Sequence, residues 1–495
     1  MRLGIFLAVV FLGILHRASS VPHGVLPPNT YAVGHDTSLQ VSKAPADECK
    51  NVSSSGSQKC GTKTVTHEKT VIPIEKTGKT EIINGENRGC PGDKARQLKG
   101  CADIGTTTKA PVTSPTTPPS RKDPVTKKPE QCNFNNCKLP NCTCESTKPP
   151  VDDIPQFVML TFDDAVNQEN MKFYQELLAD PKRKNKASGC RIAATFFASG
   201  DYLDYPSVNE LYRMGNEIAL HSISHSIDPS PNYWNDLNTT GWEAEVVDER
   251  KMVEKYANVP AQDIRGLRGP FLFTGGDAGF RMLHRHFDYD CTLIHKRDGP
   301  DDDPVFPYTL DYGFQKPCMV HKCPNDTYPG LWTVPLNHLF RKYEEEGVDK
   351  YGPCAMADAC HPAPETSSDT FEYLRFNFES FYNTNRAPFP VFIHEAWLIN
   401  EERKKGYLRF VDWLLQKEDV YLVTVSEVID FMREPKSRSS YAQRRCTKED
   451  LPESTCPKQK TCHYPTTTLG KERYMRICGT NCPKNYPWVN NPDGN

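Results

Sequence analysis

Apolar residues in the middle of the chain follow two kinds of pattern. Short continuous runs, which are typical of buried strands, cover residues 157–162, 192–198, 217–220, 391–393 and 420–425. Between them, apolar residues recur three or four positions apart and predict helices over residues 170–178, 208–214, 242–257 and 407–415. Repeated strand–helix units predict a parallel sheet covered by helices, arranged either as a barrel or as an open sheet.

Acidic and histidine side chains follow two of the predicted strands. Asp163 and Asp164 end the first run, and His221 and His225 come directly after the third. The carboxyl ends of parallel strands are where α/β folds place their sites. A spacing of four puts both imidazoles on one side of a helical turn. Two imidazoles and one carboxylate have the ligand count of a catalytic zinc site, and they also suit cobalt, iron or manganese. The second carboxylate is then left for proton transfer.

The two ends of the chain differ in composition from its middle. Residues 1–20 combine a positive start, a short apolar run and a small-residue cleavage site, which predicts a secretory signal peptide. Residues 21–104 are polar and contain four cysteines, and residues 105–131 form a linker rich in Thr, Pro and Lys. A structured domain is expected over residues 132–435, followed by a Cys-rich appendage at residues 436–495.

Cysteine content and charge narrow the class of protein. The chain has 19 cysteines, which predicts disulfides in an oxidising compartment, and the odd number leaves at least one thiol without a partner in the chain. No apolar segment is long enough to span a bilayer, so we expect a secreted, extracellular protein without a membrane anchor. The formal net charge is -3 and no basic face is visible, which argues against a nucleic-acid partner.

Four strings in one order carry a family resemblance. They are Thr161 to Asn167 (TFDDAVN), His221 to His225 (HSISH), Arg268 to Phe271 (RGPF) and Phe392 to Leu398 (FIHEAWL). With them the chain resembles the polysaccharide deacetylase (NodB-homology) family, in particular the secreted chitin deacetylases of invertebrates. The resemblance covers about residues 132 to 433. It implies a distorted (β/α) barrel as the catalytic domain. The cysteine positions add Cys-rich appendages at both ends of that domain.

The resemblance also implies roles for the matching residues. Asp163 would be the general base, and His394 would be the general acid. One divalent metal ion, zinc or cobalt, would be held by Asp164, His221 and His225. The chemistry suits an N-acetyl amide, because such an ion acidifies water and polarises a carbonyl while the two other groups move protons.

Four more residues are expected around these groups. Arg268 would line the groove and orient the base, and the backbone N–H of Phe271 would help to hold the oxyanion. Phe392 shares a strand face with His394 and is a candidate lining of the acetyl pocket. Trp397 is a candidate to stack on a sugar ring. The alternatives are a surface salt bridge for Arg268 and core packing for Phe271 and Trp397.

The expected function is removal of N-acetyl groups from N-acetylglucosamine polymers, chitin above all, in an extracellular matrix or cuticle. The alternatives are a non-catalytic, chitin-binding matrix protein with the same fold and an esterase that removes O-acetyl groups. One family feature is not visible: the Asp-x-x-Asp-Trp string that tunes the catalytic histidine of bacterial relatives is absent near Asp290 and Asp311.

Overall fold

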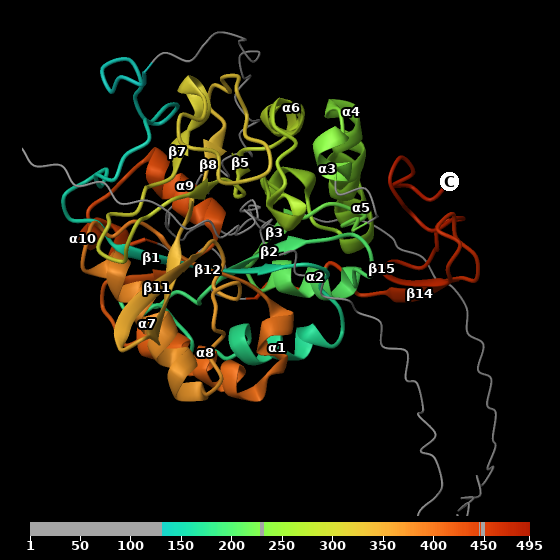
Figure 1. The fold of residues 1–495 in the computed structure, drawn as a ribbon. Helices are drawn as coiled ribbons and strands as arrows, with labels where there is room; N and C mark the ends of the chain where they lie inside the picture. Colours follow the sequence, from blue (N-terminus) through green and yellow to red (C-terminus); the bar gives the residue numbers. More distant parts are fainter. Residues whose placement is uncertain (1–130, 228–231, 445, 447–450) are drawn as a thin grey trace, which may run out of the picture. The chain divides into compact units, whose positions relative to one another are not determined.

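The computed structural model describes residues 131–495, apart from residues 228–231, 445 and 447–450 (Figure 1). The predicted signal peptide, the polar region 21–104 and all but the last residue of the linker 105–131 therefore lie outside the described residues. None of the described helices is both long enough and apolar enough to cross a membrane.

Nine strands form the main sheet among the described residues. They are β1 (Gln156–Asp163), β2 (Ala194–Ala198), β3 (Glu217–Leu220), β4 (Gly266–Leu267), β5 (Tyr289–Asp290), β7 (Tyr308–Thr309), β8 (Trp332–Thr333), β12 (Phe389–His394) and β13 (Val420–Leu422). Their order is β12-β1-β2-β3-β4-β5-β8-β7, and β13 pairs with the start of β1. All pairs are parallel except β7 with β8. The predicted α/β class with a distorted barrel is confirmed, and no described pairing between β12 and β7 closes the barrel.

Most of the helices occupy the segments between these strands, and the last two follow β13. The helices are α1 (Asn170–Leu178), α2 (Tyr205–Arg213), α3 (Tyr233–Asp236), α4 (Thr239–Trp242), α5 (Asp248–Ala257), α6 (Asp277–His286), α7 (Ser367–Tyr382), α8 (Glu401–Leu414), α9 (Val425–Arg433) and α10 (Arg438–Ala442). A π-helix, η1 (Glu243–Val247), joins α4 directly to α5, so the predicted helix 242–257 changes its winding midway. The predicted strand 420–425 was too long, because Thr424 caps α9 through a reciprocal capping box with Glu427.

Burial explains why the first strands read as unbroken apolar runs. All residues of β1 and β2 are buried, as expected for parallel strands covered on both faces. Figure 1 shows α1, α7 and α8 along one side of the sheet. There the Phe162 ring packs against Tyr174 of α1 at 5.0 Å and Tyr407 of α8 at 6.3 Å between ring centroids. This packing fixes the strand that ends in the two aspartates.

Disulfides staple the surface of the fold. The described pairs are Cys132–Cys144, Cys137–Cys142, Cys190–Cys446, Cys318–Cys323, Cys354–Cys360, Cys456–Cys478 and Cys462–Cys482. Among the described cysteines Cys291 alone is free, and it is buried. Six pairs close short loops, whereas Cys190–Cys446 joins residues 256 positions apart and ties the C-terminal segment to the chain ahead of β2.

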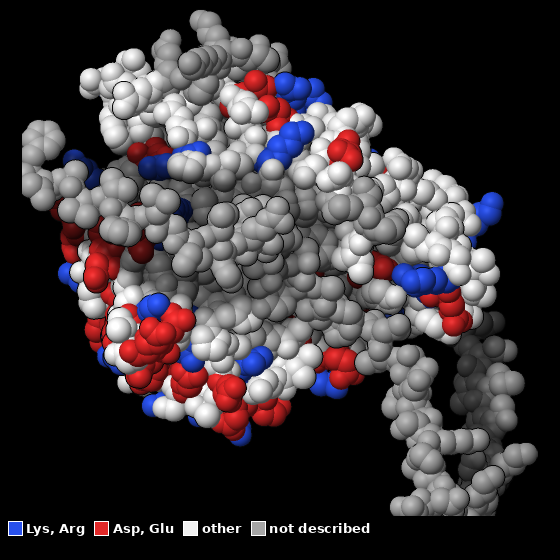
Figure 2. Space-filling view, viewed as in Figure 1, with Lys and Arg blue, Asp and Glu red and all other residues white. Residues whose placement is uncertain are grey.

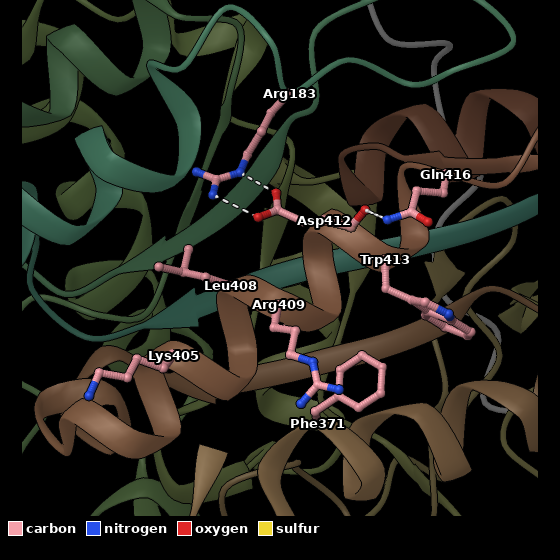
Figure 3. A pocket seen from close by; sticks show the side chains of 8 residues that line it. All are labelled: Arg183, Phe371, Lys405, Leu408, Arg409, Asp412, Trp413 and Gln416. Atoms are coloured by element: carbon pink, nitrogen blue, oxygen red, sulfur yellow. Dashed lines mark hydrogen bonds and ion pairs between the residues drawn. The ribbon is translucent and has the colours of Figure 1, made fainter. Parts of the chain in front are cut away.

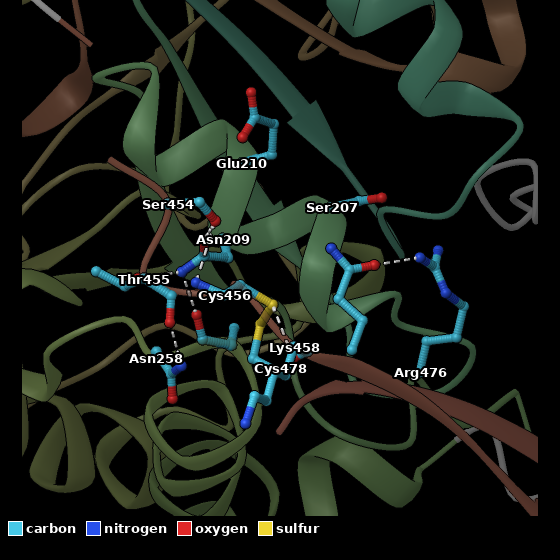
Figure 4. Close-up of a disulfide and its surroundings, with 12 residues drawn as sticks. Ser207, Asn209, Glu210, Asn258, Ser454, Thr455, Cys456, Lys458, Arg476 and Cys478 are labelled. Atoms are coloured by element: carbon cyan, nitrogen blue, oxygen red, sulfur yellow. Dashed lines mark hydrogen bonds between the residues drawn. A yellow bond between two sulfur atoms is a disulfide. The ribbon is translucent and has the colours of Figure 1, made fainter. Parts of the chain in front are cut away.

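The C-terminal segment docks through side chains as well as through that disulfide. It contains the hairpin β14 (Gln459–Tyr464) and β15 (Arg473–Cys478). Figure 4 shows Asn209 and Asn258 beside Thr455. The amide nitrogen of Asn209 donates to Thr455 Oγ1 at 2.6 Å, and that of Asn258 donates to the Thr455 carbonyl oxygen at 2.7 Å. Arg473 of β15 pairs with Asp201 in the loop after β2 at 3.1 Å. The C-terminal segment thus reaches the carboxyl end of the sheet.

Three small strand pairs lie outside the main sheet. One is parallel, β6 (Ile294–His295) with β9 (Leu336–Asn337), and the others are β14 with β15 and β10 (Leu339–Glu345) with β11 (Val348–Cys354). The tip of the β10–β11 hairpin is exposed and acidic. Figure 2 shows acidic side chains gathered there and over the neighbouring helices α7 and α8. Charge on an exposed hairpin edge opposes pairing with other chains.

Candidate metal centre and proton-transfer groups

The two predicted proton-transfer residues end neighbouring strands. Asp163 of β1 and His394 of β12 are direct partners in the parallel register. Asp163 is buried, and the His394 side chain is 38% exposed. The carboxylate therefore sits at the floor of the site, while the imidazole can meet a ligand from solvent.

Backbone turns bring the predicted metal ligands to the same place. Asp164 has a φ of 78°, so the chain leaves β1 with its second carboxylate on the side of the first. The segment from His221 to His225 is an irregular loop with φ values of 77° at Ser222 and 41° at His225. The predicted helical turn is therefore wrong. Left-handed backbone at non-glycine residues is costly and tends to cluster at functional sites.

The three ligand atoms lie close enough to share one ion. Asp164 Oδ1 is 3.4 Å from His225 Nε2 and 3.9 Å from His221 Nε2, and all three atoms lie within 4.8 Å of one another. His221 Nδ1 is 2.6 Å from the carbonyl oxygen of Arg268, which accepts a hydrogen bond from this nitrogen and leaves Nε2 facing the other ligands. Burial and the neighbouring His221 lower the pKa of His225 to about 4, so its imidazole is neutral, as a metal ligand must be. The donor set fits a divalent ion such as zinc.

Arg268 lies beneath the site instead of lining a groove. It is fully buried, and its guanidinium donates to Asp163 Oδ1 at 2.5 Å and to Thr161 Oγ1 at 2.9 Å. The rings of Phe197 and Phe392 cover its two faces, each with a centroid 4.1 Å from Cζ. The salt bridge to Asp163 is therefore internal. Phe392 has no exposed surface, so it supports the arginine and cannot line an open acetyl pocket.

The sequence-based prediction missed the partner of His394. Asp358 Oδ2 accepts hydrogen bonds from the His394 backbone N–H and from Nδ1, both at 2.7 Å. Burial alone would lower the pKa of His394, but the carboxylate of Asp358 outweighs it and raises that pKa to about 10. Asp358 lies in a loop closed by the Cys354–Cys360 disulfide. An Asp between two closely spaced cysteines was the available signal, but nothing in the sequence places that loop beside β12.

Phe271 and Trp397 lie in different environments. The Phe271 side chain is 41% exposed, and its ring centroid is 4.4 Å from that of His225. Its φ of 52° belongs to the sharp turn that follows β4. Trp397 is only 7% exposed, so it packs into the core, and its ring face is not available to stack on a sugar.

Large apolar side chains remain exposed on the loops that follow the strands. They are Tyr202 after β2, Ile227 after β3, Phe271 after β4 and Ile399 after β12, each more than 40% exposed. Because these loops all emerge at the carboxyl end of the sheet, the apolar groups surround the end that carries Asp163 and His394. Most other large apolar side chains of the described chain are buried.

A separate surface hollow adds no chemistry to this site. It has a volume of about 550 Å³ and is lined by Arg183, Phe371, Lys405, Leu408, Arg409, Asp412, Trp413 and Gln416 (Figure 3). None of the predicted site residues borders it. Arg183 is paired with Asp412 at 2.8 Å, and Arg409 lies over the Phe371 ring at 4.2 Å, so two of its cations are already engaged.

Comparison with known proteins identifies the class. A family model described as polysaccharide deacetylase matches residues 151–277. Chitin deacetylase 8 of Bombyx mori is 37% identical over 374 residues, which cover 73% of this chain and 93% of that protein. Chitin deacetylase 1 of the same organism is 34% identical over 383 residues, covering 73% and 68%. The chain belongs to the polysaccharide deacetylase family, as its sequence motifs predicted.

Among solved structures, the chitin deacetylase of the fungal pathogen Colletotrichum lindemuthianum aligns with 58% of this chain and 89% of its own. Its identity is 13% and its TM-score is 0.28. A likeness at this level adds nothing to the family assignment.

Proposed function

We propose that this chain is a secreted, metal-dependent chitin deacetylase that removes N-acetyl groups from N-acetylglucosamine polymers and releases acetate. The observation that carries the proposal is the convergence of two sets of groups. Asp164, His221 and His225 form one candidate ligand set, and Asp163 and His394 lie in register beside it. The names of the Bombyx mori relatives supply the substrate class.

Asp164, His221 and His225 are the residues that would hold the metal, with zinc as the proposed ion. When bound, a divalent ion supplies acidification of water and polarisation of the acetyl carbonyl. The ligand set is small enough to leave coordination positions open, as catalytic sites require.

Asp163 is the proposed general base. Its Oδ1 is taken by Arg268, which leaves Oδ2 as the oxygen that accepts a proton. Oδ2 is 4.0 Å from His221 Nε2, so it faces the ligand cluster. Arg268 thus fixes the direction in which the base points, which is the role of a positioning residue.

His394 is the proposed general acid. Because Asp358 engages Nδ1, Nε2 is the nitrogen that can donate to the departing amine. A raised pKa keeps this imidazole protonated at neutral pH, as an acid requires. The backbone N–H of Phe271 is proposed to donate to the oxyanion, since the turn after β4 places this residue against His225.

The exposed rim supports a polymeric substrate. Sugar rings present flat, weakly polar C–H faces, and exposed aromatic and aliphatic side chains can cover them. Tyr202, Ile227 and Phe271 offer such surface on loops next to the ligand cluster. The disulfide-rich exterior supports secretion, together with the predicted signal peptide at residues 1–20.

Acetate release by the full secreted chain tests the proposal. Chitin oligomers are incubated with metal-depleted protein, and zinc or cobalt is then added back. We expect release only with metal, and loss of release in Asp163→Asn. Chitin binding without acetate release, with metal bound, would support the matrix-protein alternative. Release from O-acetyl substrates alone would support the esterase alternative.

A further inference from the structure

Two buried glutamates lie behind the loop that carries the histidine ligands. Glu245 belongs to the π-helix η1 and Glu249 to α5, and neither has any exposed surface. Buried carboxylates are rare unless they have partners, because desolvation of the charge is costly. A π-helix is also uncommon and is often found near functional sites. The buried glutamates and the π-helix therefore both indicate a function for this segment.

The glutamates bind the backbone between the two histidines. Glu249 Oε2 accepts from the backbone N–H of Ser222 at 2.8 Å. Glu245 Oε2 accepts from the backbone N–H of Ser224 at 3.0 Å, and its own carbonyl oxygen accepts from the N–H of Ile223 at 3.0 Å. Three consecutive N–H groups of the loop are thus held by one helical segment.

Side-chain contacts extend this grip. Glu245 Oε1 accepts from Ser224 Oγ at 2.7 Å and from the Tyr233 hydroxyl at 2.5 Å. Ser224 lies directly before the ligand His225, and Ser222 lies directly after the ligand His221. Because the anchored residues are the chain neighbours of His221 and His225, they fix the backbone positions from which both imidazoles extend.

The conformation of the loop explains why anchoring is needed. Ser222 and His225 both have positive φ values, which a free chain of L-residues rarely adopts. A buried N–H without an acceptor would also destabilise this loop conformation relative to others. Acceptors on a helix therefore hold the strained backbone in place and pair its buried N–H groups.

We propose that Glu245 and Glu249 are positioning residues that hold the 221–225 loop in the geometry in which His221 and His225 bind one metal ion. The inference rests on the proposed metal site. It assigns no contact between the glutamates and the ion or the substrate. The helical segment from η1 to α5 then supports the strained loop, and the loop supplies the two histidine ligands.

The test compares substitutions that keep or remove the acceptor. Glu249→Gln keeps a carbonyl oxygen for Ser222, whereas Glu249→Leu has similar size and no acceptor. Glu245→Leu removes the acceptors for Ser224 and Tyr233. The matched control is Glu217→Leu, because Glu217 is also buried and hydrogen-bonded, to Thr195 and Ser426, but does not touch the loop.

The readout is the zinc dissociation constant of the metal-free full chain, measured by competition with a chelator of known affinity. Loss of groups that orient metal ligands typically weakens affinity by about 10- to 100-fold. We expect such a loss in Glu245→Leu and Glu249→Leu, and affinity close to that of the wild type in Glu249→Gln and Glu217→Leu. Wild-type affinity in both loop-facing Leu variants would overturn the inference. An equal loss in the Glu217 control would also do so.

A milder variant covers the case in which the Leu variants do not fold. Ser224→Ala removes one hydroxyl donor to Glu245 at nearly constant shape, and we expect a several-fold weaker zinc affinity with a normal folded spectrum. Unchanged affinity in this variant would overturn the contribution of the Ser224 hydroxyl contact to the positioning role of Glu245. If the wild-type chain binds zinc but releases no acetate, the proposed function fails while the positioning role is still decided by the affinities.

Discussion

The carboxylate of Asp358 binds His394 twice, through the backbone N–H and through Nδ1, with both distances at 2.7 Å. One contact fixes the end of β12, and the other fixes the orientation and proton of the ring. A single side chain thereby sets both the position and the protonation state of the proposed acid. The Cys354–Cys360 disulfide closes the loop from which Asp358 reaches the strand.

Asp358→Asn should move the alkaline limb of the activity profile to lower pH. The carboxylate raises the pKa of His394, so its neutralisation should lower that pKa by about 1–3 units. Because the acid must be protonated, activity would then fall at a lower pH than in the wild type. Acetate release measured from pH 5 to 10 checks this, and an unshifted alkaline limb would contradict the assignment.

The same pair should affect stability in a defined direction. A group whose pKa is higher in the folded state contributes stability below its unfolded value and loses it as the pH rises through its folded value. For His394 this contribution is present below about pH 6.5 and is lost toward pH 10. Thermal unfolding of the wild type and of Asp358→Asn should therefore differ at pH 6 and converge near pH 10.

Arg268→Lys should lower kcat more than the same substitution at Arg265. Lysine keeps the charge but cannot contact Asp163, Thr161 and the Cys291 carbonyl together from between two rings. We expect a loss of kcat of about 10²-fold or more, because the base would be misplaced. Arg268→Met should cost about 3–5 kcal/mol of unfolding free energy, since it leaves a buried carboxylate unpaired.

The control for Arg268 lies three residues earlier in the chain. Arg265 precedes the two-residue strand β4, at the opposite end of that strand from Arg268, and pairs with Asp430 and Asp288. Arg265→Lys should leave kcat close to that of the wild type. Equal losses of kcat in the two Lys variants would show that Arg268 acts through general stability and has no specific part in orienting Asp163.

Tyr202→Ala should weaken the binding of long substrates more than that of short ones. Tyr202 is 62% exposed, has a φ of 63°, and is covered on one face by Arg473 at 4.6 Å from Cζ to ring centroid. Loss of one aromatic contact is worth about 0.5–1.5 kcal/mol, or about 2- to 10-fold in KM. Steady-state kinetics on chitin dimers to hexamers measures the difference.

Tyr474 provides the matched control for that experiment. It is 59% exposed on β15, and its ring stacks on His463 at 4.6 Å. Tyr474→Ala should leave the dependence of KM on chain length unchanged. If Tyr202→Ala behaves in the same way, the loop after β2 does not contact the polymer.

Sequence patterns predicted the parts of the site that follow strands, and they failed where distant segments meet. The runs before Asp163 and His221 read correctly because buried parallel strands are apolar on both faces. The turn at His221 to His225 was misread because side-chain spacing does not reveal positive φ values. Asp358 and the sandwich of Arg268 between Phe197 and Phe392 were missed because they depend on tertiary packing.

Metal removal should separate the ligand residues from the base. An ion that binds only the folded state stabilises it by about 2.7 kcal/mol when present at 100 times its dissociation constant. We therefore expect a chelator to lower the Tm of the wild type and added zinc to restore it. His225→Ala should unfold at a Tm that neither treatment moves, because one of the three clustered ligand atoms is gone. Asp163→Asn should lose acetate release yet keep the zinc-dependent rise in Tm, since its Oδ1 is held by Arg268 and its role is to accept a proton. If Asp163→Asn also lost the rise in Tm, Asp163 would have to be counted among the ligands, and another group would have to serve as the base.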